Sequence, residues 1–90
     1  MKDFEGNEEK RGSNIAKHGI DFLDAIRVFD DGYRIECETE RQCERRLQTI
    51  GMMDGIIIVF VVYVARNHKK RIISARVACK KERDAYYGAR

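Results

Sequence analysis

The sequence predicts a single α+β domain over residues 1–90, in which an antiparallel sheet packs with two N-terminal helices and one C-terminal helix. Helix-capping residues and a helical spacing of apolar residues occupy the first third of the chain. From Tyr33 the spacing changes to strand-like alternation, and strand-like segments then follow one another without intervening helices. This order favours a meander of antiparallel strands over a βαβ repeat.

The first helix is expected to begin after Asn7 and to end at Gly19. Asn7 is a favourable N-cap residue, and Glu8 and Glu9 lie in the first turn, where the helix dipole favours acidic side chains. Glycine is a usual stop residue for helices. Before this helix, Phe4 begins either a short strand or a loop.

The second helix is expected to be short and to begin after Asp21, another N-cap residue. The sequence Asp30-Asp31-Gly32 ends it. A helix with this spacing turns one apolar stripe toward the core, formed by Phe22, Ala25, Ile26 and Phe29.

The remainder of the chain is expected to form the sheet and the last helix. Residues 33–40 alternate between apolar and charged side chains, as in a strand with one wet face. Residues 56–64 are almost wholly apolar, which is typical of a central strand buried on both faces. Asp54-Gly55 predicts a hairpin before this strand. The expected strands are 33–40, 45–50, 56–64 and 71–77, with a charged loop at 41–44, a turn at 67–70 and a helix at 80–87.

The cysteines and the apolar runs predict a cytoplasmic protein without a membrane partner. Three cysteines, Cys37, Cys43 and Cys79, with no CxxC pair argue against a disulfide framework and a sulfur-rich zinc site. The first residues lack the apolar segment of a signal peptide. The longest apolar run, 56–65, is about half of the roughly 20 residues that a membrane helix needs.

Positive charge is concentrated near the C-terminus. Between Arg66 and Arg83 the chain has eight lysines and arginines and one acid, Glu82, although its overall net charge is only +3. Such a basic stretch on a small domain is typical of a protein that binds the phosphate backbone of nucleic acids. The alternative, on charge alone, is an ordinary solvated strand and helix.

Three sequence blocks, which together cover nearly the whole chain, are Asn14-x-x-Lys17-His18-Gly19-Ile20-x-Phe22, Glu44-x-Arg46, and Arg71-Ile72-Ile73-Ser74-Ala75-Arg76. These blocks resemble the BrnT toxins and occur in the family's order. The resemblance implies the ribonuclease half of a type II toxin–antitoxin pair, which inhibits translation and growth. It also implies a fold similar to RelE-type toxins and an antitoxin of the BrnA type, a ribbon-helix-helix DNA-binding protein.

Enzymes can cleave RNA without a metal when the 2′-hydroxyl attacks the adjacent phosphate. The protein must then accept a proton, stabilise the phosphorane charge and protonate the leaving oxygen. No cofactor is expected, and the two histidines have no carboxylate at a zinc-site spacing. The catalytic candidates are Glu44 as base, His18 as base or acid, Arg46 and Arg76 as phosphate clamps, and Tyr63 as donor; the RNA-binding candidates are Lys17, Lys69, Lys70 and Arg71.

Each candidate has a structural alternative. His18 can satisfy the end of the first helix, Tyr63 can simply pack in the core, and Arg76 can form an ion pair with Glu82 or Glu44. Arg71 and Arg76 are five residues apart, so they face opposite sides of a regular strand unless a bulge intervenes. Arg76, which shares its face with Ser74, is therefore the better candidate.

Two other functions remain open at this point. A non-catalytic nucleic-acid-binding module would need the basic stretch but neither Glu44 nor His18. A protein-interaction domain would use the same stretch to bind an acidic partner.

Overall fold

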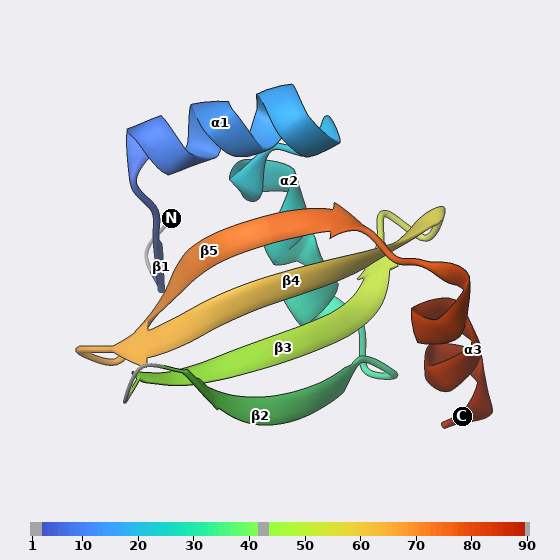
Figure 1. Ribbon diagram of the computed structural model, residues 1–90. Coiled ribbons are helices and arrows are strands. Elements are labelled where there is room, and N and C mark those ends of the chain that lie inside the picture. The colour runs from blue at the N-terminus through green and yellow to red at the C-terminus, as the bar shows by residue number, and fades with distance from the viewer. Residues whose placement is uncertain (1–2, 42–43, 90) are drawn as a thin grey trace.

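The computed structural model describes residues 3–41 and 44–89 and contains a five-stranded sheet in the order β1-β5-β4-β3-β2 (Figure 1). The predicted α+β fold, with two helices before the sheet and one after it, is confirmed. The loop expected at 41–44 centres on residues 42 and 43, which lie outside the described residues. The elements are β1 Phe4–Glu5, α1 Glu8–His18, α2 Phe22–Ala25, the 3₁₀ helix η1 Ile26–Asp30, β2 Ile35–Arg41, β3 Glu44–Met53, β4 Ile57–Arg66, β5 Lys69–Val77 and α3 Lys80–Gly88.

The predicted ends of α1 are confirmed. The Asn7 side chain accepts hydrogen bonds from the backbone N–H groups of Glu9 and Lys10, at 2.8 and 3.3 Å. Gly19 ends the helix in the left-handed conformation, with φ 71°. Asp21 likewise caps α2 by accepting from the N–H of Leu23.

The second helix is wound more tightly than expected. It has four α-helical residues and continues as the 3₁₀ helix η1. A 3₁₀ helix has three residues per turn, so residues three apart share a face. Phe22, Ala25 and Val28 are therefore the fully buried residues, whereas Ile26 and Phe29 pack at the edge of the core.

The sheet is mixed rather than wholly antiparallel. Strands β2 to β5 form the predicted meander, but β1 pairs with β5 in parallel, with Phe4 opposite Lys70 and Glu5 opposite Arg71. The N–H of Lys70 also donates to the carbonyl of Asp3 at 3.0 Å. A strand of two residues is too short to show a periodic pattern. The sequence therefore could not distinguish a strand from a loop at Phe4.

Tight turns set the strand ends. Asp54 and Gly55 have φ 56° and 69°, and Ile56, expected in the strand, lies in this turn with 85% of its surface exposed. Asn67 and His68 also have positive φ and close the β4–β5 hairpin, so β5 begins at Lys69 rather than Arg71. Similarly, β2 begins at Ile35, and β3 continues to Met53.

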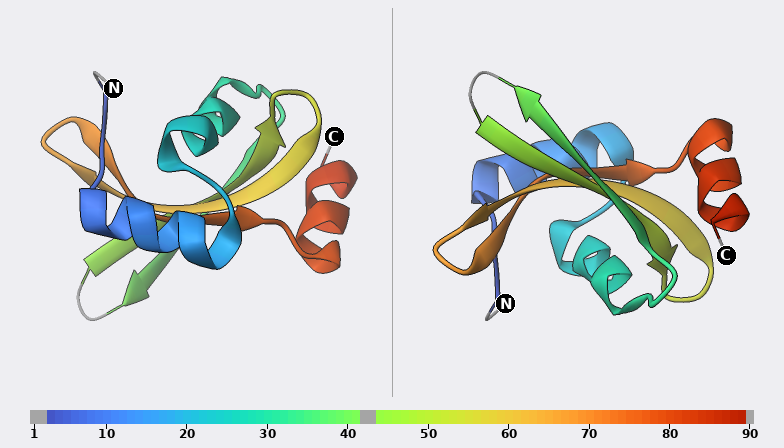
Figure 2. Two further views of the ribbon diagram at one scale, coloured as in Figure 1. Left: turned by 90° about the horizontal axis from the view of Figure 1, so that it is seen from above. Right: turned by 90° about the horizontal axis from the view of Figure 1, so that it is seen from below.

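The two faces of the sheet are covered differently (Figure 2). α2 and η1 pack on one face, over the buried side chains of Val59, Val61 and Ile72. On the other face α3 covers only the end near Ile58, where Tyr86 is buried. The rest of that second face is not covered by a helix (Figures 1 and 2).

Helix α1 is fixed along the outer edge of β5 by a buried amide. The Asn14 side chain donates to the carbonyls of Ile20 and Ala75, both at 2.8 Å, and accepts from the N–H of Ala75 at 3.1 Å. Asn14 therefore forms hydrogen bonds with the backbone N–H and carbonyl of Ala75 at the edge of β5, as a neighbouring strand would. Arg11 of α1 also forms an ion pair with Asp21 at 2.7 Å, and this hydrogen-bonded guanidinium lowers the pKa of Asp21 to about 2.

Cys79 is the N-cap residue of α3, with Glu82 three residues after it. The N–H of Cys79 donates to the Glu82 carboxylate at 2.9 Å, and Cys79 is exposed. A thiol accepts hydrogen bonds more weakly than a hydroxyl. We expect Cys79→Thr to raise the free energy of unfolding by about 0.5–1.5 kcal/mol, measured by chemical denaturation. A lower melting temperature in this variant would contradict the capping role.

Candidate nucleic-acid interface

A β-bulge brings the two arginines of β5 to the same side of the sheet. Ser74 pairs with Val62 and Ile72 pairs with Tyr63, so Ile73 is an extra residue in β5. Beyond the bulge the alternation is reversed, and Arg71 lies opposite Val64 just as Arg76 lies opposite Phe60. The exception that the sequence allowed, a bulge between Arg71 and Arg76, is therefore observed, and both arginines face the same side.

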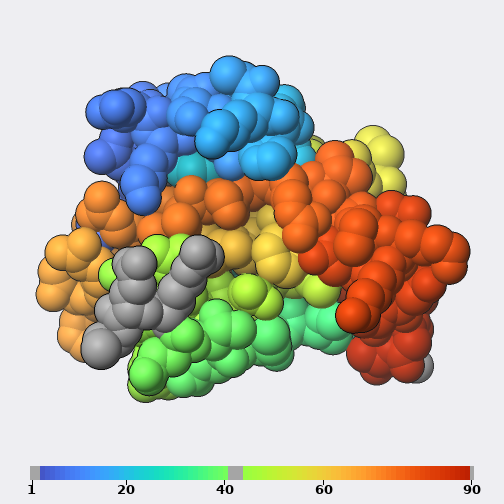
Figure 3. All heavy atoms as spheres, in the orientation of Figure 1, coloured from blue at the N-terminus to red at the C-terminus, as the bar shows by residue number. Residues whose placement is uncertain are grey.

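Both arginines lie on the face away from η1, which we call the open face. Figure 3 looks onto it: atoms of β4 and β5 are exposed there between α1 and α3. Alternation along β3 places Glu44 on the same face, two residues before Arg46. The open face is defined by Glu44, Arg46, Gln48, Phe60, Arg71, Ser74 and Arg76.

Arg76 is held in a fixed position at one end of the open face. Its Nη1 and Nη2 atoms donate to the two carboxylate oxygens of Glu82, each at 2.8 Å, and its guanidinium lies 4.3 Å from the centre of the Phe60 ring. The ion pair with Glu82 raises the pKa of Arg76 and lowers that of Glu82. The alternative of an ion pair with Glu82 is thus observed. The same contacts orient a half-buried arginine at the N-terminal end of α3.

Glu44 and Arg46 lie at the other end of the open face. Arg46 Nε donates to Glu44 Oε1 at 3.2 Å, within strand β3. Arg76 lies opposite Phe60, Phe60 opposite Ile50, and Arg46 is four residues before Ile50. Strand spacing and rise then separate the Cα atoms of Arg46 and Arg76 by about 16 Å. The two arginines share a face, but this separation favours contacts with different phosphates over contacts of both with a single phosphate.

His18 and Lys17 face a groove between α1 and β5. This groove has a volume of about 210 Å³, and Ile73 and Ser74 form its β5 side. Both His18 and Lys17 are exposed at the end of α1. The sequence prediction missed Ser13 and Lys10, which line the groove one and two helical turns before Lys17. Ser13 is four residues before Lys17, and Lys10 is three residues before Ser13; this helical spacing is the signal that would have found them.

The two lysines of the β4–β5 hairpin point to different faces. Lys69 is exposed opposite Arg66, on the side of the open face. Lys70 lies opposite Ala65 on the other side, and its ammonium group is 5.7 and 5.4 Å from the ring centres of Phe4 and Phe29. Lys69 therefore lies on the same face of the sheet as Arg71, whereas Lys70 lies on the opposite face.

Tyr63 is also on the face that the helices cover. It is 4% exposed, and its hydroxyl donates to the Glu36 carboxylate, which accepts the Thr49 hydroxyl as well. Burial and the hydrogen bond to Glu36 raise the pKa of Tyr63 to about 12. The structure thus places Tyr63 in the core, away from the open face that carries Arg46 and Arg76, in agreement with the packing alternative.

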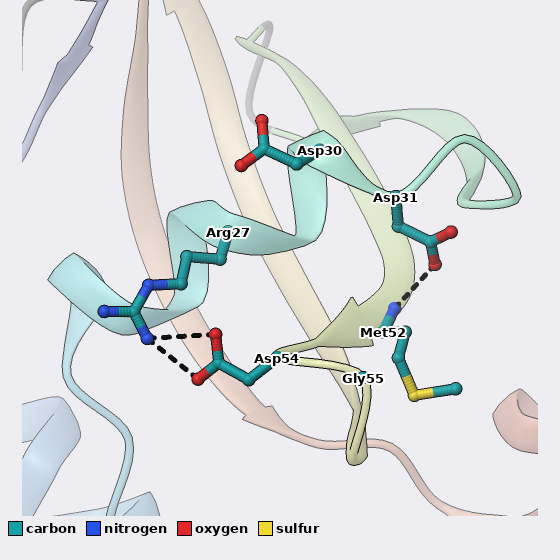
Figure 4. A pocket seen from close by; sticks show the side chains of 6 residues that line it. All are labelled: Arg27, Asp30, Asp31, Met52, Asp54 and Gly55. Atoms are coloured by element: carbon teal, nitrogen blue, oxygen red, sulfur yellow. Dashed lines mark hydrogen bonds and ion pairs between the residues drawn. The ribbon is translucent and has the colours of Figure 1, made fainter.

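A larger hollow, of about 360 Å³, lies among η1 and the β3–β4 turn (Figure 4). Its side chains are mainly acidic, including Asp30 and Asp31, and Arg27 there is paired with Asp54 at 2.8 Å. Asp31 accepts hydrogen bonds from Tyr86 and from the N–H of Met52. Carboxylates repel phosphates, so this hollow is a poor candidate for binding nucleic acid.

No group of three or more His, Cys, Asp or Glu side chains in residues 3–41 and 44–89 is placed to hold a metal ion. No helix within these residues is long and apolar enough to cross a membrane.

Comparisons with known proteins agree at the level of sequence and of structure. A family model described as the ribonuclease toxin BrnT of type II toxin–antitoxin systems matches residues 7–82. The crystal structure of the Brucella abortus ribonuclease toxin BrnT is similar to this chain with a TM-score of 0.65 and 30% sequence identity, over 86% of this chain and 96% of that one. No curated protein matches the chain. The family match includes every candidate site residue described above.

Proposed function

The chain belongs to the BrnT family, the ribonuclease toxins of type II toxin–antitoxin systems, and on this basis we propose that it binds and cleaves RNA on the open face of its sheet. The main observation that supports this proposal is the bulge at Ile73, because it brings Arg71 and Arg76 to the same face of the sheet, the open face. Arginine suits the task because its planar guanidinium holds two phosphate oxygens at once.

Two groups on this surface are suited to proton transfer. Glu44, exposed beside Arg46, would accept the proton as the general base. His18, which lines the groove with Ser74, would act as base or acid. Because these groups lie toward different parts of the open face, we propose that the RNA strand extends over it and that successive phosphates contact Arg46, Arg71 and Arg76.

Metal-independent cleavage is the second part of the proposal. Attack by the RNA 2′-hydroxyl needs a base, an acid and charge stabilisation, all of which these protein side chains supply. We expect purified protein to cleave RNA in excess EDTA and to leave 2′,3′-cyclic phosphate ends. Cleavage abolished by EDTA and restored by a divalent cation would contradict metal independence. Binding without cleavage would favour a non-catalytic RNA-binding module.

Salt dependence tests whether the open face contacts the RNA backbone. Each phosphate neutralised on a single strand is expected to contribute about −0.7 to the slope of log affinity against log salt. Contacts by Arg46, Arg71 and Arg76 predict a slope of about −2. Arg71→Ala should reduce that slope by about 0.7, whereas Arg27→Ala, on the opposite side of the molecule, should leave it unchanged. A flat response in the wild-type protein would favour the protein-interaction alternative.

The family implies an antitoxin partner, which we propose is of the ribbon-helix-helix BrnA type and neutralises the toxin by covering the open face. An acidic or amphipathic segment would complement the charge of Arg66, Lys69, Arg71 and Arg76. Lys70, also considered from the sequence, faces the aromatic side chains on the other side.

Competition measures this neutralisation directly. Saturating antitoxin should abolish RNA binding, and the double substitution Arg66→Glu and Lys69→Glu should slow antitoxin association by about tenfold or more at low salt. If the toxin–antitoxin complex binds RNA as well as the free toxin does, inhibition acts elsewhere.

A further inference from the structure

A second, smaller hollow lies on the open face itself, separate from the groove of α1. It has a volume of about 150 Å³ and is formed by β2, β3 and β4. Ile35, Ile50 and Phe60 are paired across these strands and supply apolar side chains. Cys37 and Gln48, also paired, supply polar side chains, and Glu36, whose carboxylate accepts from Thr49 and Tyr63, completes the lining. The hollow is thus a short apolar surface with one polar flank, which is suited to a flat ring with hydrogen-bonding edges.

Phe60 connects this hollow to the proposed phosphate contact. Its ring lines the hollow and also lies under the guanidinium of Arg76, 4.3 Å from the ring centre. Glu82 holds that guanidinium in place through two hydrogen bonds. A nucleotide whose phosphate contacts Arg76 therefore has an aromatic ring and an apolar hollow beside it, where a base can stack.

Gln48 provides the polar group that a base would meet. Its Oε1 accepts from the thiol of Cys37 at 3.4 Å, a weak hydrogen bond. Its amide nitrogen has no hydrogen-bond partner among residues 3–41 and 44–89, although the residue is half-buried. A side-chain amide offers one acceptor and one donor side by side, which matches the N6 and N7 positions of adenine.

We infer that this hollow is a base-binding subsite that prefers adenine, with Phe60 as the stacking residue and Gln48 as the specificity-determining residue. The inference rests on the proposed binding of RNA to the open face. It adds sequence preference to a surface whose arginines, by themselves, contact only the phosphate backbone.

The test uses oligonucleotides that bind but are not cleaved. Fully 2′-O-methylated oligo(A), oligo(C) and oligo(U) of equal length carry the same backbone charge, so differences in affinity report on the bases. Wild-type protein should bind oligo(A) most tightly. Phe60→Leu should weaken oligo(A) binding by about tenfold through lost stacking. Gln48→Leu should remove about tenfold of the preference for oligo(A) over oligo(C) and oligo(U), while circular dichroism confirms folding. Tyr87→Leu, an exposed aromatic position on α3, is the matched control and should change neither value.

The possible results separate this inference from the proposed function. If wild-type protein binds all three oligonucleotides but Gln48→Leu leaves their order unchanged, the base subsite is wrong and RNA binding stands. If Phe60→Leu weakens antitoxin binding alone, the hollow receives a protein side chain and the inference is overturned. If wild-type protein binds none of them, the proposed RNA-binding function fails, and the base subsite fails with it.

Discussion

Replacing Arg76 by alanine is expected to lower RNA cleavage by about 10²-fold or more, the effect of removing one preorganised group that stabilises transition-state charge. Glu82 and the Phe60 ring fix this guanidinium before RNA arrives. The Arg76 guanidinium therefore needs little reorganisation during the reaction. A charged group stabilises a transition state most effectively when it is preorganised in this way. Single-turnover cleavage of a labelled RNA measures the loss, and unchanged cleavage would remove Arg76 from the site.

Two further variants separate catalysis by Arg76 from its structural ion pair. Glu82→Gln weakens the ion pair but retains Arg76 and an oxygen that can accept from the N–H of Cys79. It should therefore lose much less activity than Arg76→Ala. Arg27→Ala removes another paired arginine, bound to Asp54 on the opposite side, and should cleave as the wild type does. Equal losses in Arg76→Ala and Glu82→Gln would indicate that the ion pair, not the guanidinium charge, is required.

Asn14→Ala is expected to reduce the free energy of unfolding by about 3 kcal/mol or more. The Asn14 amide is buried and makes three hydrogen bonds to backbone groups of Ile20 and Ala75. Its removal leaves those groups without their partner, and each buried unsatisfied group costs about 1–3 kcal/mol. Some of this cost is recovered if water enters, so the lower end of the sum is expected.

Urea denaturation of the purified variant measures this change. Ser13→Ala is the matched control, because Ser13 is the exposed neighbour on the same helix, and it should change stability by less than about 0.5 kcal/mol. A loss below about 1 kcal/mol in Asn14→Ala would contradict the view that this amide attaches α1 to the sheet.

Local chemistry made much of the fold predictable from the sequence. Asn7, Gly19 and Asp21 marked the helix ends because side-chain capping and left-handed glycine act within a few residues. Asp54-Gly55 marked a turn for the same reason. The family resemblance was carried by short blocks in a fixed order, and the family match and the similar crystal structure both agree with it.

The arrangement of the candidate site was less predictable, because it depends on contacts between distant residues. The bulge at Ile73 appears only in the pairing of β5 with β4, and it moved Arg71 to the face of Arg76. Tyr63 lies on the covered face because of the register with Leu47 and Ile72. The hollow at Gln48 and Phe60 requires three strands at once, so no single segment of sequence reveals it.

The contacts of β1 and α1 with β5 have a consequence for how the protein folds during synthesis. β1 pairs with residues 70 and 71, and Asn14 bonds to Ala75, 61 positions later. Such distant contacts carry the cost of closing a long loop before they stabilise anything. During synthesis, α1 has no edge to dock on until β5 has left the ribosome, and Arg76 has no ion-pair partner until Glu82 has followed. A nascent or truncated chain without residues 69–82 therefore lacks the assembled arginine surface, and the proposed RNA cleavage should arise only after these residues have left the ribosome.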